Sequence, residues 1–260
     1  MGRWPRTWPT HQDGPGVVAR RVLKTSAPER VKRPNQVPIF LIFIQGVTMR
    51  IASFVGQKGG VGKSTLARVL AVAAARQEYK VLIGDFDLEQ LSCVEWSASR
   101  LRNNIEPEIE ARAFKSLKKL LKTVVDYDLI VVDTRGLADE LTQDISQESD
   151  VVFLPTSTSM DDLRPTLALA RRLAKTKTVS NKIVIVLSKT GRSDRLLEQA
   201  EATIAEAGFD MLNAVWPERD GFQADLDVGK AGSEATNPYL KQAAVEVESA
   251  MLTLALGRKG

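Results

Sequence analysis

Residues 57–65, Gln-Lys-Gly-Gly-Val-Gly-Lys-Ser-Thr, have the composition and spacing of a phosphate-binding loop. Glycine lacks a Cβ, so successive backbone N–H groups in such a loop can turn toward one anion. Lys63 can then reach the terminal phosphates of a nucleotide, and the hydroxyl of Ser64 can ligate Mg²⁺. The loop departs from the strict P-loop pattern twice, because Gln57 stands where that pattern has glycine and Lys58 is an additional lysine.

The segments on either side support this interpretation. An apolar run over 51–55 precedes the loop and a helix-forming run over 66–75 follows it, which predicts strand, loop and helix. The N-terminus of that helix would add its positive end to the anion site. A glycine turn without a ligand is the alternative, and the Gly-Lys-Ser sequence between both flanks outweighs it. The candidate nucleotide-binding residues of the loop are Lys58, Gly59, Gly60, Val61, Gly62, Lys63, Ser64 and Thr65.

Two further apolar runs end in aspartates. The run 81–84 leads into Asp85 and Asp87, and the run 129–132 leads into Asp133. Since ligands of open parallel sheets bind at the carboxyl ends of the strands, these carboxylates should lie beside the phosphate loop. Asp133 has the form of a Walker B aspartate, which holds Mg²⁺ through its water shell.

Asp87 is the candidate for orienting or deprotonating the attacking water, and it could also contribute to the metal site. Helix capping is the alternative for such aspartates. For Asp85 the catalytic and structural interpretations have equal weight. The candidate catalytic residues are Lys58, Lys63 and Asp87, and the candidate metal ligands are Ser64, Asp87 and Asp133.

Strand and helix patterns alternate from residue 49 onward. We expect strands at 50–55, 81–86, 108–114, 128–133, 150–154, 182–187 and 211–216. We expect helices at 63–77, 88–102, 115–125, 137–146, 160–176, 193–207, 221–230 and 236–255. Several strands are continuous apolar runs, as in sheets buried on both faces. The pattern predicts a three-layer, doubly wound α/β domain with a mostly parallel sheet, as in P-loop NTPases.

Composition excludes several other classes. The chain has 260 residues, of which 43% are hydrophobic, so one large globular domain can bury an ample core. A single cysteine, Cys93, argues against a disulfide framework, a thiolate zinc site and an iron–sulfur cluster held by this chain alone, and suits a reducing cytosol. No apolar run approaches the roughly 20 residues that span a membrane.

The basic charge is concentrated at the start of the chain. Residues 1–48 contain eight Arg or Lys and two acidic residues, a net charge of +6, whereas the whole chain carries +4. Residues 49–260 are therefore net −2. We expect 1–48 to be a disordered extension upstream of a natural start at Met49, with a DNA-holding basic arm as the alternative. A signal peptide fits poorly, because its basic region would be very long.

Together these motifs resemble the ParA/MinD family of deviant Walker A ATPases, particularly its small plasmid and chromosome partition proteins. The similarity extends over nearly all of 49–260. The segments that carry it are 58–64, 85–92 with Trp96, and 127–134, with weaker echoes at 149–155 and at 219–222 with Gly229.

The resemblance implies roles for individual residues. Lys58 corresponds to a signature lysine that crosses a sandwich dimer to the partner's nucleotide, Lys63 to the phosphate lysine and Asp87 to the hydrolytic aspartate. It also implies ATP and Mg²⁺ as cofactors and places Ser188 and Pro217 among the nucleotide-binding residues.

Three positions depart from the family pattern. Glu89 replaces a common proline, Thr134-Arg135-Gly136 replaces a Thr-Pro-Pro type of loop, and Ser188 stands where many members have asparagine.

The function implied is partition. ATP would drive homodimerisation, and the dimer would bind DNA non-specifically. A ParB-like centromere-binding protein would stimulate hydrolysis. The protein would therefore be cytoplasmic and associated with the nucleoid. The alternative is a MinD-like ATPase at a membrane, or one that positions another cargo. The chain's last residues carry few basic and bulky apolar groups, so we expect a final helix packed on the core rather than a membrane-binding one.

DNA binding would need a basic face on the folded domain. The candidates lie on the expected helix 160–176 or after the expected strand 182–187, and an ordinary solvated face is an equally weighted interpretation. They are Arg171, Arg172, Lys175, Lys189, Arg192 and Arg195. No base-reading motif is visible, so contacts would be to phosphates and strongly dependent on salt.

Overall fold

The computed structural model describes residues 49–123, 126–136, 139–191, 193–218 and 220–257. The predicted extension, 1–48, lies outside these residues, as does Arg192 among the candidate DNA contacts.

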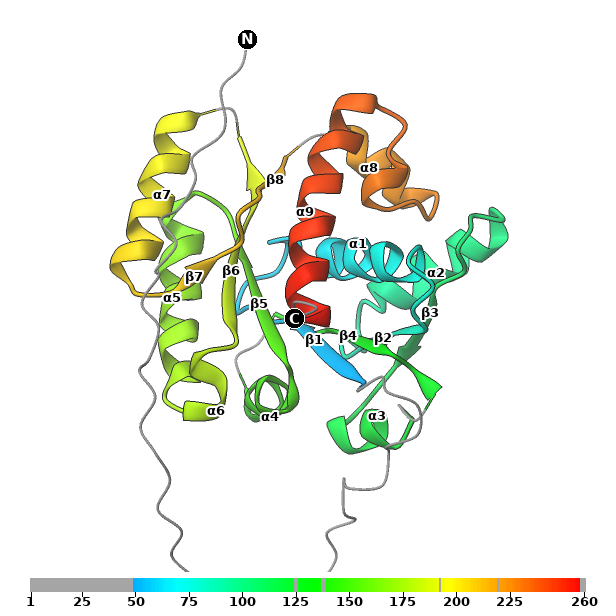
Figure 1. Ribbon diagram of the computed structural model, residues 1–260, viewed down its shortest axis with the longest axis horizontal. Helices are drawn as coiled ribbons and strands as arrows, with labels where there is room; N and C mark the ends of the chain where they lie inside the picture. Colours follow the sequence, from blue (N-terminus) through cyan, green and yellow to red (C-terminus); the bar gives the residue numbers. More distant parts are fainter. Residues whose placement is uncertain (1–48, 124–125, 137–138, 192, 219, 258–260) are drawn as a thin grey trace, which may run out of the picture. The chain divides into compact units, whose positions relative to one another are not determined.

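A parallel β-sheet forms the centre of the described part of the chain (Figure 1). Its strands are β1 (Arg50–Phe54), β2 (Val81–Asp85), β3 (Glu110–Ala113), β4 (Leu129–Asp133), β5 (Val151–Thr156), β6 (Ile183–Thr190) and β7 (Asp210–Met211). Their order is β3-β2-β4-β1-β5-β6-β7, and β8 (Trp216–Pro217) also pairs with β6. Every described pairing is parallel, which confirms the predicted fold class.

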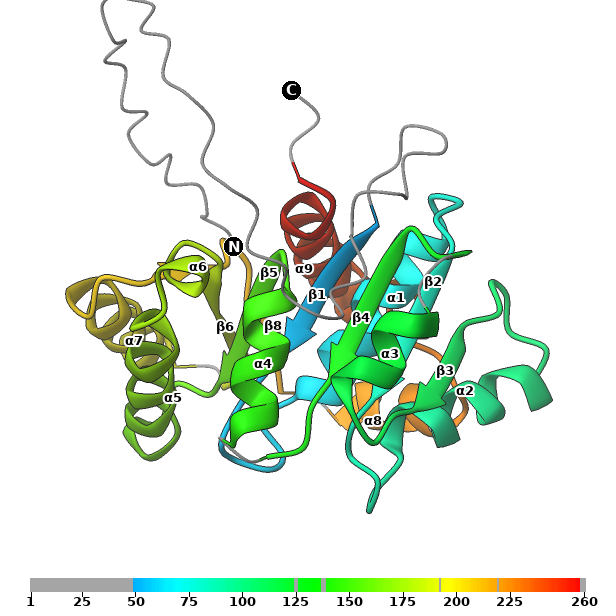
Figure 2. The same cartoon turned by 90° about the horizontal axis from the view of Figure 1, so that it is seen from below.

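Both faces of the sheet are covered by helices (Figure 2). One face carries α1 (Lys63–Ala75), α2 (Ser92–Arg102), α8 (Asp220–Asp227) and α9 (Pro238–Leu256). The other carries α3 (Leu117–Thr123), α4 (Glu140–Glu148), α5 (Met160–Ala174), α6 (Lys177–Ser180) and α7 (Asp194–Glu206). Alternate strand residues serve the two layers: Phe54 packs toward α1, whereas its neighbour Val55 packs toward α5.

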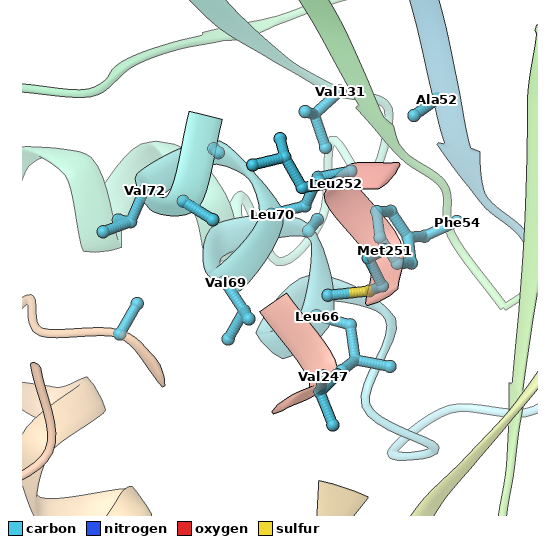
Figure 3. Close-up of a cluster of buried hydrophobic side chains, with 14 of the residues drawn as sticks. Ala52, Phe54, Leu66, Val69, Leu70, Val72, Val131, Val247, Met251 and Leu252 are labelled. Carbon is cyan, nitrogen blue, oxygen red and sulfur yellow. The ribbon is translucent and has the colours of Figure 1, made fainter. Parts of the chain in front are cut away.

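The helix after the phosphate loop is buried almost all round. In α1, nine of thirteen residues are buried, and Leu66 and Leu70 pack against Met251 of α9 and Phe54 of β1 (Figure 3). A helix with apolar residues on every side is stable only when it is enclosed. This core fixes the N-terminus of α1, and therefore the loop before it, relative to the end of β1.

Helix α9 is a core helix, as predicted. Val247, Met251, Leu252 and Ala255 are buried in the same cluster as α1. No helix in the part of the chain that the structure describes is both long and apolar enough to cross a membrane.

The expected strand over 211–216 is wrong. The structure has two short strands there, and both pair with β6. Met211 lies opposite Ile185 and Trp216 lies opposite Ser188. Between these two pairs the segment 211–216 advances by five residues, whereas β6 advances by three. The two extra residues break the ladder. The expected helix over 88–102 also starts late, at Ser92, because the preceding residues form a turn closed by Asp87.

Candidate nucleotide-binding site

The phosphate loop has the backbone that its glycines predict. Gly60 and Gly62 have φ angles of 78° and 93°, in the left-handed region that favours glycine. A Cβ on Gly62 would also lie 3.5 Å from the hydroxyl of Ser188. Helix α1 starts directly after Gly62 without a side-chain cap, so its first N–H groups face the loop. The loop is therefore shaped to hold an anion.

Lys63 carries a buried positive charge into this loop. Its side chain is 7% exposed, and Nζ donates to the carbonyl of Lys58 at 3.0 Å. Burial lowers the pKa of Lys63, and the charges of Asp133 and Asp87 partly offset that effect. A cation held by a carbonyl inside the loop is suited to a phosphate, whose charge would compensate its desolvation.

Asp133 ends β4 as a fully buried carboxylate next to α1. Its Oδ2 accepts a hydrogen bond from Cys93 Sγ at 3.3 Å, and the neighbouring hydroxyl of Ser64 lowers the pKa of this carboxyl. Its Oδ1 is buried and has no hydrogen-bond partner among the described residues. Burial, with a smaller effect from Asp85, raises the pKa of Asp133 to about 6. An unsatisfied carboxylate oxygen beside a hydroxyl fits a hydrated Mg²⁺, for which Ser64 and Asp133 are the donors.

Cys93 is a neighbour of this site that its sequence context did not indicate. One possible ligand atom each from Asp85, Cys93 and Asp133 lies within 4.8 Å of the others. Burial and the charge of Asp133 raise the pKa of the Cys93 thiol well above its usual value. The thiol therefore stays protonated and acts as a hydrogen-bond donor to Asp133 rather than as a thiolate ligand.

The structure separates the two aspartates after β2. Asp85 is fully buried, and its two carboxylate oxygens accept backbone N–H groups of Asp87 and Cys93 at 3.0 and 2.9 Å. Asp85 therefore caps α2 and holds the turn before it, which favours its structural interpretation. Asp87 is half-buried, and its carboxylate accepts the N–H of Gln90 within the same turn, at 3.1 Å. Asp87 remains the candidate for water activation.

Lys58 points away from the loop interior. Its ammonium pairs with Asp162 in the first turn of α5, and Asp162 also accepts a hydrogen bond from Ser157 at 2.6 Å. The hydrogen bond that Lys58 donates to Asp162 raises the pKa of Lys58. In a single chain this lysine is therefore held outside the phosphate cradle. Sequence reasoning missed Asp162, although an acidic residue in the first turn after β5 was a usable signal.

Ser188 contacts the phosphate loop, whereas Pro217 pairs with the end of β6. The Ser188 hydroxyl donates to the carbonyl of Val61 at 2.5 Å, so this hydrogen bond connects the loop to β6. Pro217 lies opposite Thr190, at the end of β6. Contacts of either residue with a nucleotide base remain a prediction.

The loop after β4 packs directly on the phosphate loop. Thr134 donates its hydroxyl to the carbonyl of Phe54 at 2.9 Å, which holds the loop against the end of β1. A Cβ added to Gly136 would lie 3.1 Å from the N atom of Gly59 and 3.2 Å from the carbonyl carbon of Lys58. Glycine at 136 therefore permits the contact between the two loops.

The candidate DNA contacts do not form one patch. Arg171, Arg172 and Lys175 lie at the C-terminal end of α5, whereas Lys189 ends β6 and Arg195 begins α7. Because α5 returns from the carboxyl to the amino edge of the sheet, the two groups lie at opposite ends of that helix. The charge of Lys189 reaches Asp162, at the nucleotide edge.

Burial of Asp133 predicts a pH dependence of stability without metal. Its carboxyl has an ordinary value of 3.8 in the unfolded chain and a pKa of about 6 when folded. Its contribution to stability is therefore complete below about pH 4 and is lost as the pH rises through 6, a loss of about 3 kcal/mol at 1.36 kcal/mol per unit. Urea unfolding at pH 4 and pH 7.5 measures this.

The matched variant for this measurement is Asp133→Asn, which cannot titrate. We expect the wild type to lose about 2 kcal/mol or more relative to the variant over the same pH range. Mg²⁺ should act in the opposite sense and bind more tightly as the pH rises, since it competes with the proton. Equal pH profiles for the two proteins would contradict the burial argument.

The chain is similar to known proteins in sequence and in fold. The family model of the CobQ/CobB/MinD/ParA nucleotide binding domain matches residues 52–230. The maintenance of carboxysome distribution protein A of Gloeobacter kilaueensis is 26% identical over 64% of this chain and 75% of its own length. Protein ParA of Rhizobium radiobacter is 23% identical over 70% of this chain and 84% of its own.

A solved structure has the same fold. It is the septum site-determining protein MinD of Pyrococcus horikoshii, complexed with Mg-ADP. The TM-score is 0.64 at 20% identity, with 80% of this chain and 98% of the other covered.

Proposed function

The chain belongs to the CobQ/CobB/MinD/ParA nucleotide-binding family, and from this premise we propose that it is a Mg²⁺-dependent ATPase of plasmid or chromosome partition. ATP binding makes the protein a homodimer, the dimer binds DNA non-specifically, and a ParB-like centromere-binding protein stimulates hydrolysis. The observation that carries the proposal is the phosphate loop with its two lysines, of which Lys63 is buried inside and Lys58 is held outside.

Each role follows from a position in the site. Lys63 and the loop amides hold the phosphates, and Ser64 with Asp133 holds Mg²⁺, which neutralises charge on the phosphate oxygens. Asp87 orients the attacking water. Lys58 pairs with Asp162 in the single chain and is released when a second copy brings its nucleotide to the dimer interface.

The cargo is the least constrained part of the proposal. The relatives include a protein of carboxysome distribution and a ParA protein, and the fold is also that of a septum-site protein. Packing of α9 in the core disfavours a membrane-binding C-terminal helix within the described residues. We therefore favour a cytoplasmic protein that acts on the nucleoid. The second candidate function is the positioning of a cargo other than a plasmid or chromosome.

Replacing Asp87 by alanine should separate hydrolysis from binding. The phosphate contacts remain, so ATP affinity should change only a few-fold. Loss of a general base typically costs about 10²–10⁴ in rate, so turnover should fall by at least about 100-fold. The variant should consequently accumulate as an ATP-bound dimer in sizing chromatography. Glu95→Ala, an exposed acid on α2, is the control and should turn over normally. Wild-type turnover by the Asp87 variant would move the role elsewhere.

DNA binding tests the partition proposal. Duplex binding is measured with ATP, with ADP and without nucleotide, over a salt series. We expect binding only with ATP, because dimerisation doubles each basic patch and two patches on one body bind with a high effective concentration. Charge reversal at Arg171 and Lys175 should weaken binding to every sequence and reduce the salt slope by about one unit for each phosphate that the protein no longer neutralises.

The control reverses two exposed lysines on another helix, Lys118 and Lys119 of α3, and should bind as the wild type. Tight binding that ignores the nucleotide would remove the switch from the proposal. No binding by an ATP-loaded dimer would favour the other-cargo candidate.

A further inference from the structure

Arg135 lies two residues after Asp133, the buried carboxylate at the end of β4, where the resembled family commonly has proline. Its guanidinium donates to Asp139, the N-cap residue of α4, at 2.7 Å. The two side chains are 47% and 32% exposed. Exposed pairs of this kind contribute little to stability, so a more highly charged anion can displace Asp139 from Arg135 easily.

The sheet order places Arg135 beside the phosphate loop. Strand β1 lies between β4 and β5, so the loop after β1 is flanked by the loop after β4 and by the start of α5. Each flank has a cation paired with an aspartate. On the α5 side Lys58 pairs with Asp162, and on the β4 side Arg135 pairs with Asp139. The contact of Gly136 with the backbone of Lys58 and Gly59 holds the β4 side against the cradle.

The surroundings of Arg135 are strongly acidic. Besides Asp139, the charges of Glu89 and of Asp87, the candidate hydrolytic residue, act on the guanidinium. A bound triphosphate would add several negative charges to this edge. Arginine stays ionised at any physiological pH and offers a planar fork of donors that matches phosphate oxygens. Lys63, by contrast, is fixed deep in the loop by the carbonyl of Lys58.

We propose that Arg135 is a catalytic residue of ATP hydrolysis in its own chain. Its guanidinium exchanges Asp139 for the transferring phosphoryl group and stabilises the negative charge that develops there. This inference rests on the proposed ATPase function and adds a residue to it. In the reaction the oxygen of a water bonds to the γ-phosphorus while the bond from that phosphorus to the β–γ bridging oxygen breaks. The electron pair stays on the bridging oxygen of ADP, and the water's proton leaves by way of Asp87 to the released phosphate.

The role explains the sequence of the loop. A proline at 135 could not supply a cation, and Arg135 would provide in one chain a charge that Lys58 can bring only from a partner. The contribution should appear in the transition state and not in ground-state binding, because Asp139 satisfies the guanidinium beforehand. Such a donor is worth roughly 10²–10³ in the catalytic rate.

The test compares four full-length proteins: wild type, Arg135→Ala, Arg135→Lys and Asp139→Ala. Single-turnover hydrolysis gives the catalytic rate. Equilibrium binding of Mg-ADP, with and without aluminium fluoride as a transition-state analogue, gives a readout independent of turnover. We expect Arg135→Ala to lose about 100-fold or more both in rate and in the extra affinity for the analogue, with Mg-ADP affinity within about three-fold. Arg135→Lys should recover part of both.

Asp139→Ala separates catalysis from structure, because it breaks the same ion pair and leaves Arg135 in place. It should hydrolyse ATP at the wild-type rate or faster. Equal losses in Arg135→Ala and Asp139→Ala would show that the pair merely holds the start of α4, and would overturn the inference. An active wild type with an equally active Arg135→Ala variant would overturn the inference alone. A wild type that neither binds nor hydrolyses ATP would overturn the proposed function as well.

Discussion

Replacing Lys63 by alanine is expected to weaken ATP binding by about 100-fold or more. Hydrogen bonds to charged groups contribute about 1.5–3 kcal/mol, and this ammonium is almost completely buried in the loop. A loss of about 3 kcal/mol corresponds to a roughly 100-fold weaker complex. Isothermal titration with ATP and Mg²⁺ measures the affinity directly, without dependence on turnover.

The same loop provides the matched control. Lys58 is five residues earlier and carries the same charge, but its ammonium is held by Asp162 outside the cradle. Lys58→Ala should therefore keep ATP affinity within a few-fold in the single chain and fail at the dimer stage. Comparable losses in the two variants would mean that net charge, and not position in the loop, determines binding.

A second variant excludes unfolding as the cause. Lys63→Met keeps most of the side-chain volume and removes the charge, whose burial already lowers the pKa of Lys63. Burying a charge is unfavourable, so the unfolding free energy of the nucleotide-free protein should not fall. Full ATP affinity in either Lys63 variant would refute the assignment of the phosphate cradle.

The fold was predictable because its determinants are local. Each central strand is a continuous apolar run, and each is followed by a helix pattern, which only a parallel sheet covered on both faces satisfies. The phosphate loop was predictable for the same reason, since its glycines and Lys63 are contiguous. The edge of the sheet was not: a run with strand-like composition over 211–216 is interrupted because β6 offers fewer partners than that run has residues.

The polar contacts of the site join residues that are distant in the sequence. Asp162 holds Lys58 across 104 residues and Cys93 reaches Asp133 across 40, and a local sequence pattern does not pair residues over such separations. The roles of Asp85 and Asp87, two residues apart, are equally ambiguous in sequence. Asp85 caps α2, whereas Asp87 does not. The difference arises because the backbone N–H of Cys93, at the start of α2, lies against the end of β2 and donates to Asp85. Such assignments depend on backbone N–H groups, which a sequence pattern does not place.

The second large effect is expected at a buried ion pair near the C-terminal end of α2. Arg100 of α2 is 1% exposed and donates two hydrogen bonds, of 2.5 and 2.7 Å, to the carboxylate of Glu234. The guanidinium also donates to the carbonyls of Pro107 and Gly229 and lies 5.6 Å from the ring centre of Trp96. The pair therefore ties α2, which begins just after the Asp87 turn, to the segment that leads into α9.

Glu234→Ala should lower the free energy of unfolding by about 3–5 kcal/mol, because it leaves a buried guanidinium without its carboxylate. Urea unfolding measures the loss. The control is an exposed pair of the same residue types, Glu110 and Arg112, with side chains 44% and 46% exposed; Glu110→Ala should cost less than about 1 kcal/mol. A double variant, Arg100→Met with Glu234→Leu, should be less destabilised than the sum of its single variants, since no unmatched charge remains buried. Additive losses would show that the pair acts through packing and not through charge, and a loss below about 1 kcal/mol in Glu234→Ala would mean that water reaches Arg100 in the folded protein.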